Sequence, residues 1–89
     1  MFAVHLSPDA DAFLDKLDKH IQERLKKRIA RLGDTPVPAD AKFIEHDSGG
    51  AMIFRYRIGD FRALYKVLHT EKSVLVIKID KRSRVYDRQ

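Results

Sequence analysis

Three arginines lie close together in two short runs that flank Gly59-Asp60. Both runs alternate between polar and apolar residues, and a Gly-Asp pair between such runs is typical of a two-residue hairpin loop. In that hairpin Arg57 lies opposite Arg62, and Arg55 lies beside them on the same face. Like charges directly opposite each other in a ladder are unfavourable. The pattern therefore indicates a binding site for an anion, and the planar arginine fork suits phosphate in particular.

The hairpin is expected over residues 51–68, and its second face is apolar. That face carries Met52, Phe54, Tyr56, Ile58, Phe61, Ala63 and Tyr65.

A further strand is expected over residues 74–80, and its register decides which side chains join the arginines. A three-residue loop pairs His69 with Ser73 and places Lys78 and Arg82 on the Arg62 face. A two-residue loop would bury Lys78, which is costly. We therefore expect the three-residue loop. In this register one face of the strand carries Leu75, Ile77 and Ile79, and the other carries Val74, Val76, Lys78 and Asp80.

The cations gathered on this surface would suit the cleavage of RNA without a metal ion. Cleavage requires a deprotonated 2′-hydroxyl, a stabilised phosphorane and a neutralised 5′-oxygen as it departs. Preorganised donors aimed at developing charge are worth about 10²–10³ in rate each. An aromatic ring beside a basic groove can stack on a base, and Tyr86 follows the last strand. The expected cationic surface consists of Arg55, Arg57, Arg62, Lys66, Lys78 and Arg82.

Composition narrows the choice of partners and chemistry. The chain has 89 residues, a net charge of +5 and a pI of about 9.7, which favours nucleic acid, an acidic protein or an anionic membrane surface as partner. The absence of cysteine excludes disulfides, thiolate metal sites and a cysteine nucleophile. The scattered His5, His20 and His69 give no metal-ligand spacing, so no cofactor is expected. The first residues do not resemble a signal peptide, and we expect a cytoplasmic protein without a membrane span.

The remaining segments predict an α+β fold in one domain, residues 1–89. Residues 2–6 read as a short strand, and Ser7-Pro8 is a strong helix start. Apolar spacing predicts one helix over residues 8–17 and a second from Asp18 to a cap at Gly33. A proline-containing connector leads to a brief extended piece at 42–45 and a loop at 46–50. The N-terminal strand and the two-helix hairpin are expected to pack on a small, mainly antiparallel, twisted sheet.

The hairpin and the basic tail together resemble the RelE branch of the RelE/ParE toxin superfamily. The resemblance rests on the run from Arg55 to Val67 and on Lys81-Arg-Ser-Arg-Val-Tyr86, about twenty residues after Arg62. It extends over nearly the whole chain and implies a RelE-like fold. Such proteins are toxins of toxin–antitoxin pairs that cleave messenger RNA in the ribosomal A site, by 2′-hydroxyl attack and without a metal. The resemblance also implies a cognate antitoxin that wraps around the toxin in a hetero-oligomer, and it implies no membrane partner.

The resemblance assigns roles to particular positions. Arg62 matches the arginine that stabilises the transition state, and Arg82 matches the arginine that acts on the leaving group. Tyr86 matches the tyrosine that orients or stacks on the nucleotide. Arg55 and Arg57 stand where well-studied relatives have lysines. The side chains expected to bind RNA around them are Lys66, Lys78, Lys81 and Arg84.

The two arginines at lysine positions leave the general base open. A guanidinium stays protonated, with a pKa above about 12, and is a poor base. The base lies elsewhere, or charge stabilisation and positioning dominate, or activity is lower than in those relatives. Glu45 and His46 immediately precede the hairpin and are candidates, although a solvent-exposed loop histidine is the commoner situation.

Two other functions compete with ribosome-dependent cleavage. One is a ParE-like toxin that inhibits DNA gyrase by binding alone, and the other is a weakened toxin that only binds its antitoxin. A gyrase-binding protein needs neither converging arginines nor Tyr86 in a phosphate-sized arrangement, so these residues favour the nuclease. The exchange of arginine for lysine keeps the weakened toxin open.

Overall fold

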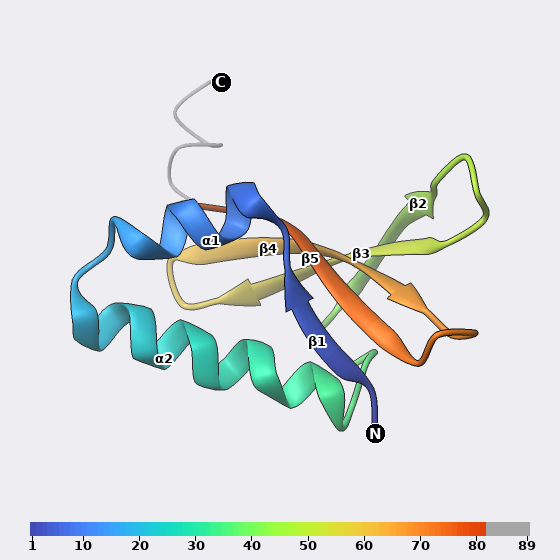
Figure 1. The fold of residues 1–89 in the computed structure, drawn as a ribbon, viewed down its shortest axis with the longest axis horizontal. Helices are drawn as coiled ribbons and strands as arrows, with labels where there is room; N and C mark the ends of the chain where they lie inside the picture. The colour runs from blue at the N-terminus through green and yellow to red at the C-terminus, as the bar shows by residue number, and fades with distance from the viewer. Residues whose placement is uncertain (82–89) are drawn as a thin grey trace.

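The computed structural model describes residues 1–81 and is shown in Figure 1. Its elements are, in chain order, β1 (Ala3–Leu6), α1 (Pro8–Asp15), α2 (Lys19–Ala30), a 3-10 turn η1 (Arg31–Gly33), β2 (Lys42–His46), β3 (Met52–Ile58), β4 (Phe61–Leu68) and β5 (Ser73–Lys81). The extended piece predicted at 42–45 is therefore a strand that is one residue longer, and α1 is two residues shorter than predicted.

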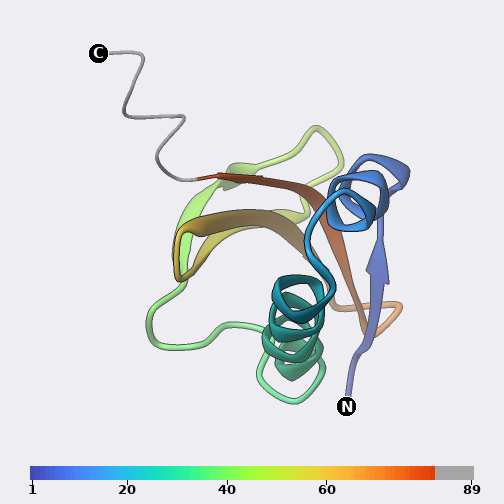
Figure 2. The same ribbon diagram turned by 90° about the vertical axis from the view of Figure 1, so that its left-hand side faces the viewer.

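The strands form one five-stranded sheet in the order β1-β5-β4-β3-β2. β1 runs parallel to β5, and the other pairs are antiparallel. Both helices contribute buried side chains to a single core on one face of the sheet, and Figure 2 shows α2 beneath the arch of β3 and β4. The predicted α+β architecture is confirmed.

Ser7 starts α1 and also ties it to the sheet. Its hydroxyl accepts a hydrogen bond from the backbone N–H of Ala10 at 3.1 Å and donates one to the carbonyl of Ile77 at 2.6 Å. Pro8 follows at the first helical position, as predicted. Because one side chain caps the helix and bonds β5, the position of α1 on the sheet is fixed at its first residue.

The second helix ends differently from the prediction. Gly33 lies in η1 and does not take the left-handed conformation of a glycine cap; the glycines with positive φ are Gly50 and Gly59. Gly33 is required by close packing, because a Cβ there would lie 2.7 Å from the carbonyl oxygen of Phe2. The backbone N–H of Phe2 donates to the Gly33 carbonyl at 2.7 Å, so this contact joins the helices to the edge of the sheet.

The central hairpin agrees with the prediction in loop and register. Gly59 has φ of 58°, Ile58 pairs with Phe61, and Arg57 pairs with Arg62. Alternation along β3 and β4 then sends one set of side chains into the core. Its buried members are Phe54, Tyr56, Ile58, Phe61, Ala63, Tyr65 and Val67.

The predicted register of β5 is wrong next to its turn and correct beyond it. Leu68, not His69, pairs with Ser73, so the turn has four residues. A β-bulge then intervenes, because Tyr65 pairs with Val76 while Leu64 pairs with Lys78. The extra residue restores the predicted register for the second half of the strand. Lys78 therefore lies on the same face of the sheet as Arg62, as expected.

Because of the bulge, the predicted faces of most apolar side chains of β5 are also wrong. The prediction places Val74 and Val76 on the outward face, but both are fully buried. Ile79 is buried as well. Leu75 and Ile77, expected in the core, are only partly buried. A bulge lets the strand bury both valines and still leave the Lys78 ammonium in water, which no regular strand could do.

Among residues 1–81, no helix is both long enough and apolar enough to cross a membrane.

Candidate nucleic-acid interface

The face of β3, β4 and β5 that points away from the helices carries the cationic side chains. Arg57 lies directly opposite Arg62 across β3 and β4. Arg55 lies opposite Leu64, which in turn lies opposite Lys78 on β5. We call this surface the arginine face, defined by Arg55, Arg57, Arg62 and Lys78. The structure therefore gathers cations from three separate strands, as the sequence predicted.

The centre of the arginine face is hollowed. A depression of about 330 Å³, called here the central hollow, is lined by Ile44, Arg55, Arg62, Leu64, Lys78 and Asp80. Three cations and two aliphatic side chains thus share one depression. Such a lining can hold a phosphate by charge and contact a sugar or base through its apolar part.

Two residues that line the central hollow, Ile44 and Asp80, are not among the site residues predicted from the sequence. Asp80 lies directly opposite Arg62, and its Oδ1 accepts a hydrogen bond from the backbone N–H of Lys81 at 2.8 Å. Ile44 reaches the hollow because β2 has an irregularity between Phe43 and Glu45. The alternation of β5 places Asp80 on this face, but no pattern in the sequence signals the irregularity in β2.

Lys66 is held away from the central hollow by an ion pair. Its Nζ lies 2.6 Å from Oδ2 of Asp47, and Oδ1 of Asp47 accepts hydrogen bonds from the backbone N–H groups of Gly49 and Ala51, each at 2.9 Å. The contact fastens the loop between β2 and β3 to β4. The ion pair offsets the charge that was expected to contact RNA, and the role of Lys66 in binding stays a prediction.

The Lys66 contact should be visible in the titration of Asp47. The hydrogen bond from Lys66, with those from Ala51 and Gly49, lowers the pKa of Asp47 below its ordinary value. A carboxyl whose pKa is lower in the folded state stabilises the fold above its unfolded-state pKa of about 3.9, and this contribution is lost as the pH falls through the folded-state value. In a carbon-detected NMR titration, Lys66→Met should raise the Asp47 midpoint toward that value. An unchanged midpoint would show that Lys66 is not its partner.

The remaining predicted residues lie at or beyond the end of the described chain. Lys81 is exposed on β5 opposite Phe61. Arg82, Arg84 and Tyr86 lie outside the described residues, and their roles stay predictions. Within residues 1–81, no group of three or more histidine, aspartate or glutamate side chains is placed to hold a metal ion.

The two candidate bases lie on opposite sides of β2. Glu45 pairs with Ile53, which shares its face with Arg55. His46 pairs with Met52, which packs against the core on the other face, and its ring lies 5.2 Å from that of Phe43. Glu45 is therefore the better placed of the two for chemistry on the arginine face.

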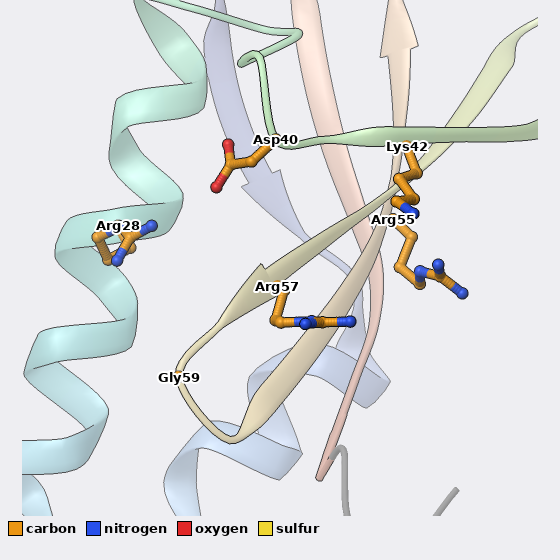
Figure 3. Close-up of a pocket in the computed structure, with 6 residues that line it drawn as sticks. All are labelled: Arg28, Asp40, Lys42, Arg55, Arg57 and Gly59. Atoms are coloured by element: carbon orange, nitrogen blue, oxygen red, sulfur yellow. The ribbon is translucent and has the colours of Figure 1, made fainter. Parts of the chain in front are cut away.

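A second depression lies beside the end of β3 and is shown in Figure 3. This edge hollow, of about 530 Å³, is lined by Arg28, Asp40, Lys42, Arg55, Arg57 and Gly59. Arg55 lines both hollows, so the two are adjacent. No pattern in the sequence indicates Arg28 as a site residue, because it lies on α2, far along the chain from the hairpin.

Comparison with known proteins identifies a family and a relative that match most of the chain. Residues 4–86 match the family described as the ParE toxin of the type II toxin–antitoxin system parDE. A protein of Methanocaldococcus jannaschii named as toxin RelE1 is 31% identical over 64 residues, which cover 72% of this chain and 71% of that relative.

Solved structures share the fold. The archaeal RelE–RelB complex of Pyrococcus horikoshii contains a chain that matches with a TM-score of 0.80 and 26% identity, over 93% of this chain and 97% of that one. The isolated RelE toxin of E. coli matches with a TM-score of 0.75 and 22% identity, over 99% and 94%. The RelE-like fold expected from the hairpin and tail is confirmed.

Proposed function

The chain belongs to the ParE/RelE family of type II toxins, and we propose that this toxin is a ribosome-dependent endoribonuclease that cleaves messenger RNA in the A site. The observation that supports the proposal best is the central hollow. Arg55, Arg62 and Lys78 come from three strands and line one depression of nucleotide size. A protein that acts only by binding gyrase has no need of this arrangement.

The proposed reaction is an internal transfer at one phosphodiester. The 2′-oxygen loses its proton and forms a bond to the adjacent phosphorus, and the bond from phosphorus to the 5′-oxygen breaks. The products are a 2′,3′-cyclic phosphate and a 5′-hydroxyl, which takes up a proton. Arg62 would stabilise the charge of the phosphorane, Arg82 would assist the leaving oxygen, and Tyr86 would stack on the nucleotide.

The proton of the 2′-hydroxyl requires an acceptor other than an arginine. In this proposal Arg55 and Arg57 bind and orient the phosphates. Glu45 shares the side of Arg55, and Asp80 lines the central hollow itself. Either carboxylate could take the proton, and charge stabilisation would supply most of the rate.

The proposal includes a protein partner. Chains of this fold have been solved as RelE–RelB complexes, and we infer that this toxin is held inactive by a cognate antitoxin in the cytoplasm, where its ribosomal target lies. The basic surface would suit an acidic antitoxin segment.

Translation with and without ribosomes tests the proposal. Messenger RNA should be cut within codons when the toxin is added to translating ribosomes, and the same RNA should remain intact when ribosomes are omitted. Primer extension locates the cuts, and a gyrase supercoiling assay is run in parallel. Intact RNA with inhibited supercoiling would replace the nuclease by the gyrase inhibitor. Intact RNA with normal supercoiling and retained antitoxin binding would indicate the weakened toxin.

A further inference from the structure

The edge hollow is lined in part by Arg28, Asp40 and Lys42, which have no role in the proposed reaction. Four of its residues are cationic and one is acidic, and they come from α2, the connector before β2, β2 itself and β3. Among the described residues, none of the four cations has a carboxylate within ion-pair distance, Asp40 included. Uncompensated cations around one depression attract an anion.

Arg28 is held in place before any ligand arrives. Its Nη2 donates a hydrogen bond to the hydroxyl of Tyr56 at 3.0 Å, and its guanidinium lies 5.5 Å from the centre of the Tyr56 ring. Tyr56 is itself buried in the core. A side chain restrained in this way loses little further freedom on binding, so its charge is preorganised toward the hollow.

The end of β3 keeps the edge hollow open. β2 pairs with β3 only as far as Arg55, so within residues 1–81 no strand lies beside the last three residues of β3 on that side. Gly59 lines the hollow without a side chain. In Figure 3 Arg28 lies on α2 across the hollow from Arg57 and Gly59, and the side chains of Arg57 and Arg55 extend from β3 away from α2.

We propose that the edge hollow binds a second nucleotide of the RNA strand whose scissile phosphate lies in the central hollow. Arg55, which lines both hollows, would stand between the two phosphates. Arg28 and Lys42 would hold the second one, and Asp40 could accept a hydrogen bond from a 2′-hydroxyl or a base amino group. The volume of about 530 Å³ exceeds the space that a lone phosphate or carboxylate fills and is typical of a small-ligand site. This inference rests on the proposed RNA substrate.

The salt dependence of RNA binding tests the inference without any cleavage. A labelled 2′-O-methyl RNA pentanucleotide cannot undergo 2′-hydroxyl attack, and its binding to the full chain is followed by fluorescence anisotropy over a range of salt. Each neutralised phosphate contributes about 0.7 to the slope of log K against log salt for a single strand. Arg28→Gln with Lys42→Gln should lower the slope by about 0.7. The matched control, Lys19→Gln with Lys72→Gln, removes the same charge from exposed positions outside both hollows and should leave the slope unchanged.

Further variants separate this inference from the proposed function. Arg62→Gln reports the central hollow alone. A lower slope with Arg62→Gln but an unaltered one with the Arg28/Lys42 pair would refute the edge site only. Unaltered slopes with both would refute RNA binding at either hollow. Weaker binding of a glutamate-rich peptide by the Arg28/Lys42 pair, with RNA binding unchanged, would assign the hollow to a protein partner instead.

Arg28→Gln removes the contact with Tyr56 and could therefore disturb the fold. In that case the test is repeated with Lys42→Gln alone, because Lys42 is exposed. An NMR titration of the unaltered chain gives an independent answer, because the pentanucleotide should shift the backbone amide of Gly59. An amide signal that does not move at saturation would overturn the inference.

Discussion

Replacing Arg62 with alanine should lower the rate of messenger RNA cleavage on the ribosome by about 10²–10³-fold and relieve growth arrest when the toxin is expressed alone. Arg62 lies in the middle strand of the three that build the arginine face, opposite Arg57 on one side and Asp80 on the other. It also lines the central hollow. Its removal would therefore leave the developing phosphorane charge without its central donor. Single-turnover cleavage of programmed ribosomes measures the effect.

Two controls make the Arg62 result specific. Arg31→Ala removes an exposed arginine from η1, outside both hollows, and should cleave like the unaltered toxin. Arg62→Lys keeps the charge but loses the planar fork, so it should recover only part of the rate. Full toxicity of a folded Arg62→Ala protein would show that the arginine face is not the active surface.

Replacing Val76 with asparagine should destabilise the fold far more than the same change at its neighbour Ile77. Val76 has no exposed surface, whereas Ile77 is partly exposed. An amide at Val76 would lose apolar contacts and bury polar atoms without partners, lowering the free energy of unfolding by about 3 kcal/mol or more. At Ile77 the amide can reach water, and the loss should be about 1 kcal/mol. Urea unfolding followed by circular dichroism measures both.

The pair tests the β-bulge directly, because a regular strand in the register predicted from the sequence would reverse the order of the two effects. Equal or reversed losses would mean that Val76 does not face the core. The bulge also brings Lys78 to the central hollow, so the result bears on the site as well as on the core.

The features fixed by local chemistry were predictable from the sequence. Gly59-Asp60 closes a two-residue turn, and the turn alone sets Arg57 against Arg62. The start of α1 at Ser7-Pro8 does not depend on tertiary packing, because the Ser7 side chain caps the backbone N–H of Ala10, three residues along the chain. Alternation over β3 and β4 assigned the core and the arginine face correctly, since both strands are regular.

The features fixed by tertiary packing were not predictable from the sequence. The irregularities in β2 and β5 add a residue to a strand where the sheet must bury one side chain and expose the next, and they have no signature in the residues involved. Gly33 reads as a helix cap, but its role is a backbone approach to Phe2. The contribution of Arg28 to the edge hollow depends on how α2 packs against Tyr56.

The chemical ends of the cut message test the central claim most directly. If the arginine face directs a 2′-oxygen onto the neighbouring phosphorus, the upstream fragment must end in a 2′,3′-cyclic phosphate and the downstream fragment must begin with a 5′-hydroxyl. Mass spectrometry of fragments from programmed ribosomes should find these ends with the unaltered toxin and only traces of them with Arg62→Ala. A 5′-phosphate on the downstream fragment, or equal cutting by Arg62→Ala, would contradict the account.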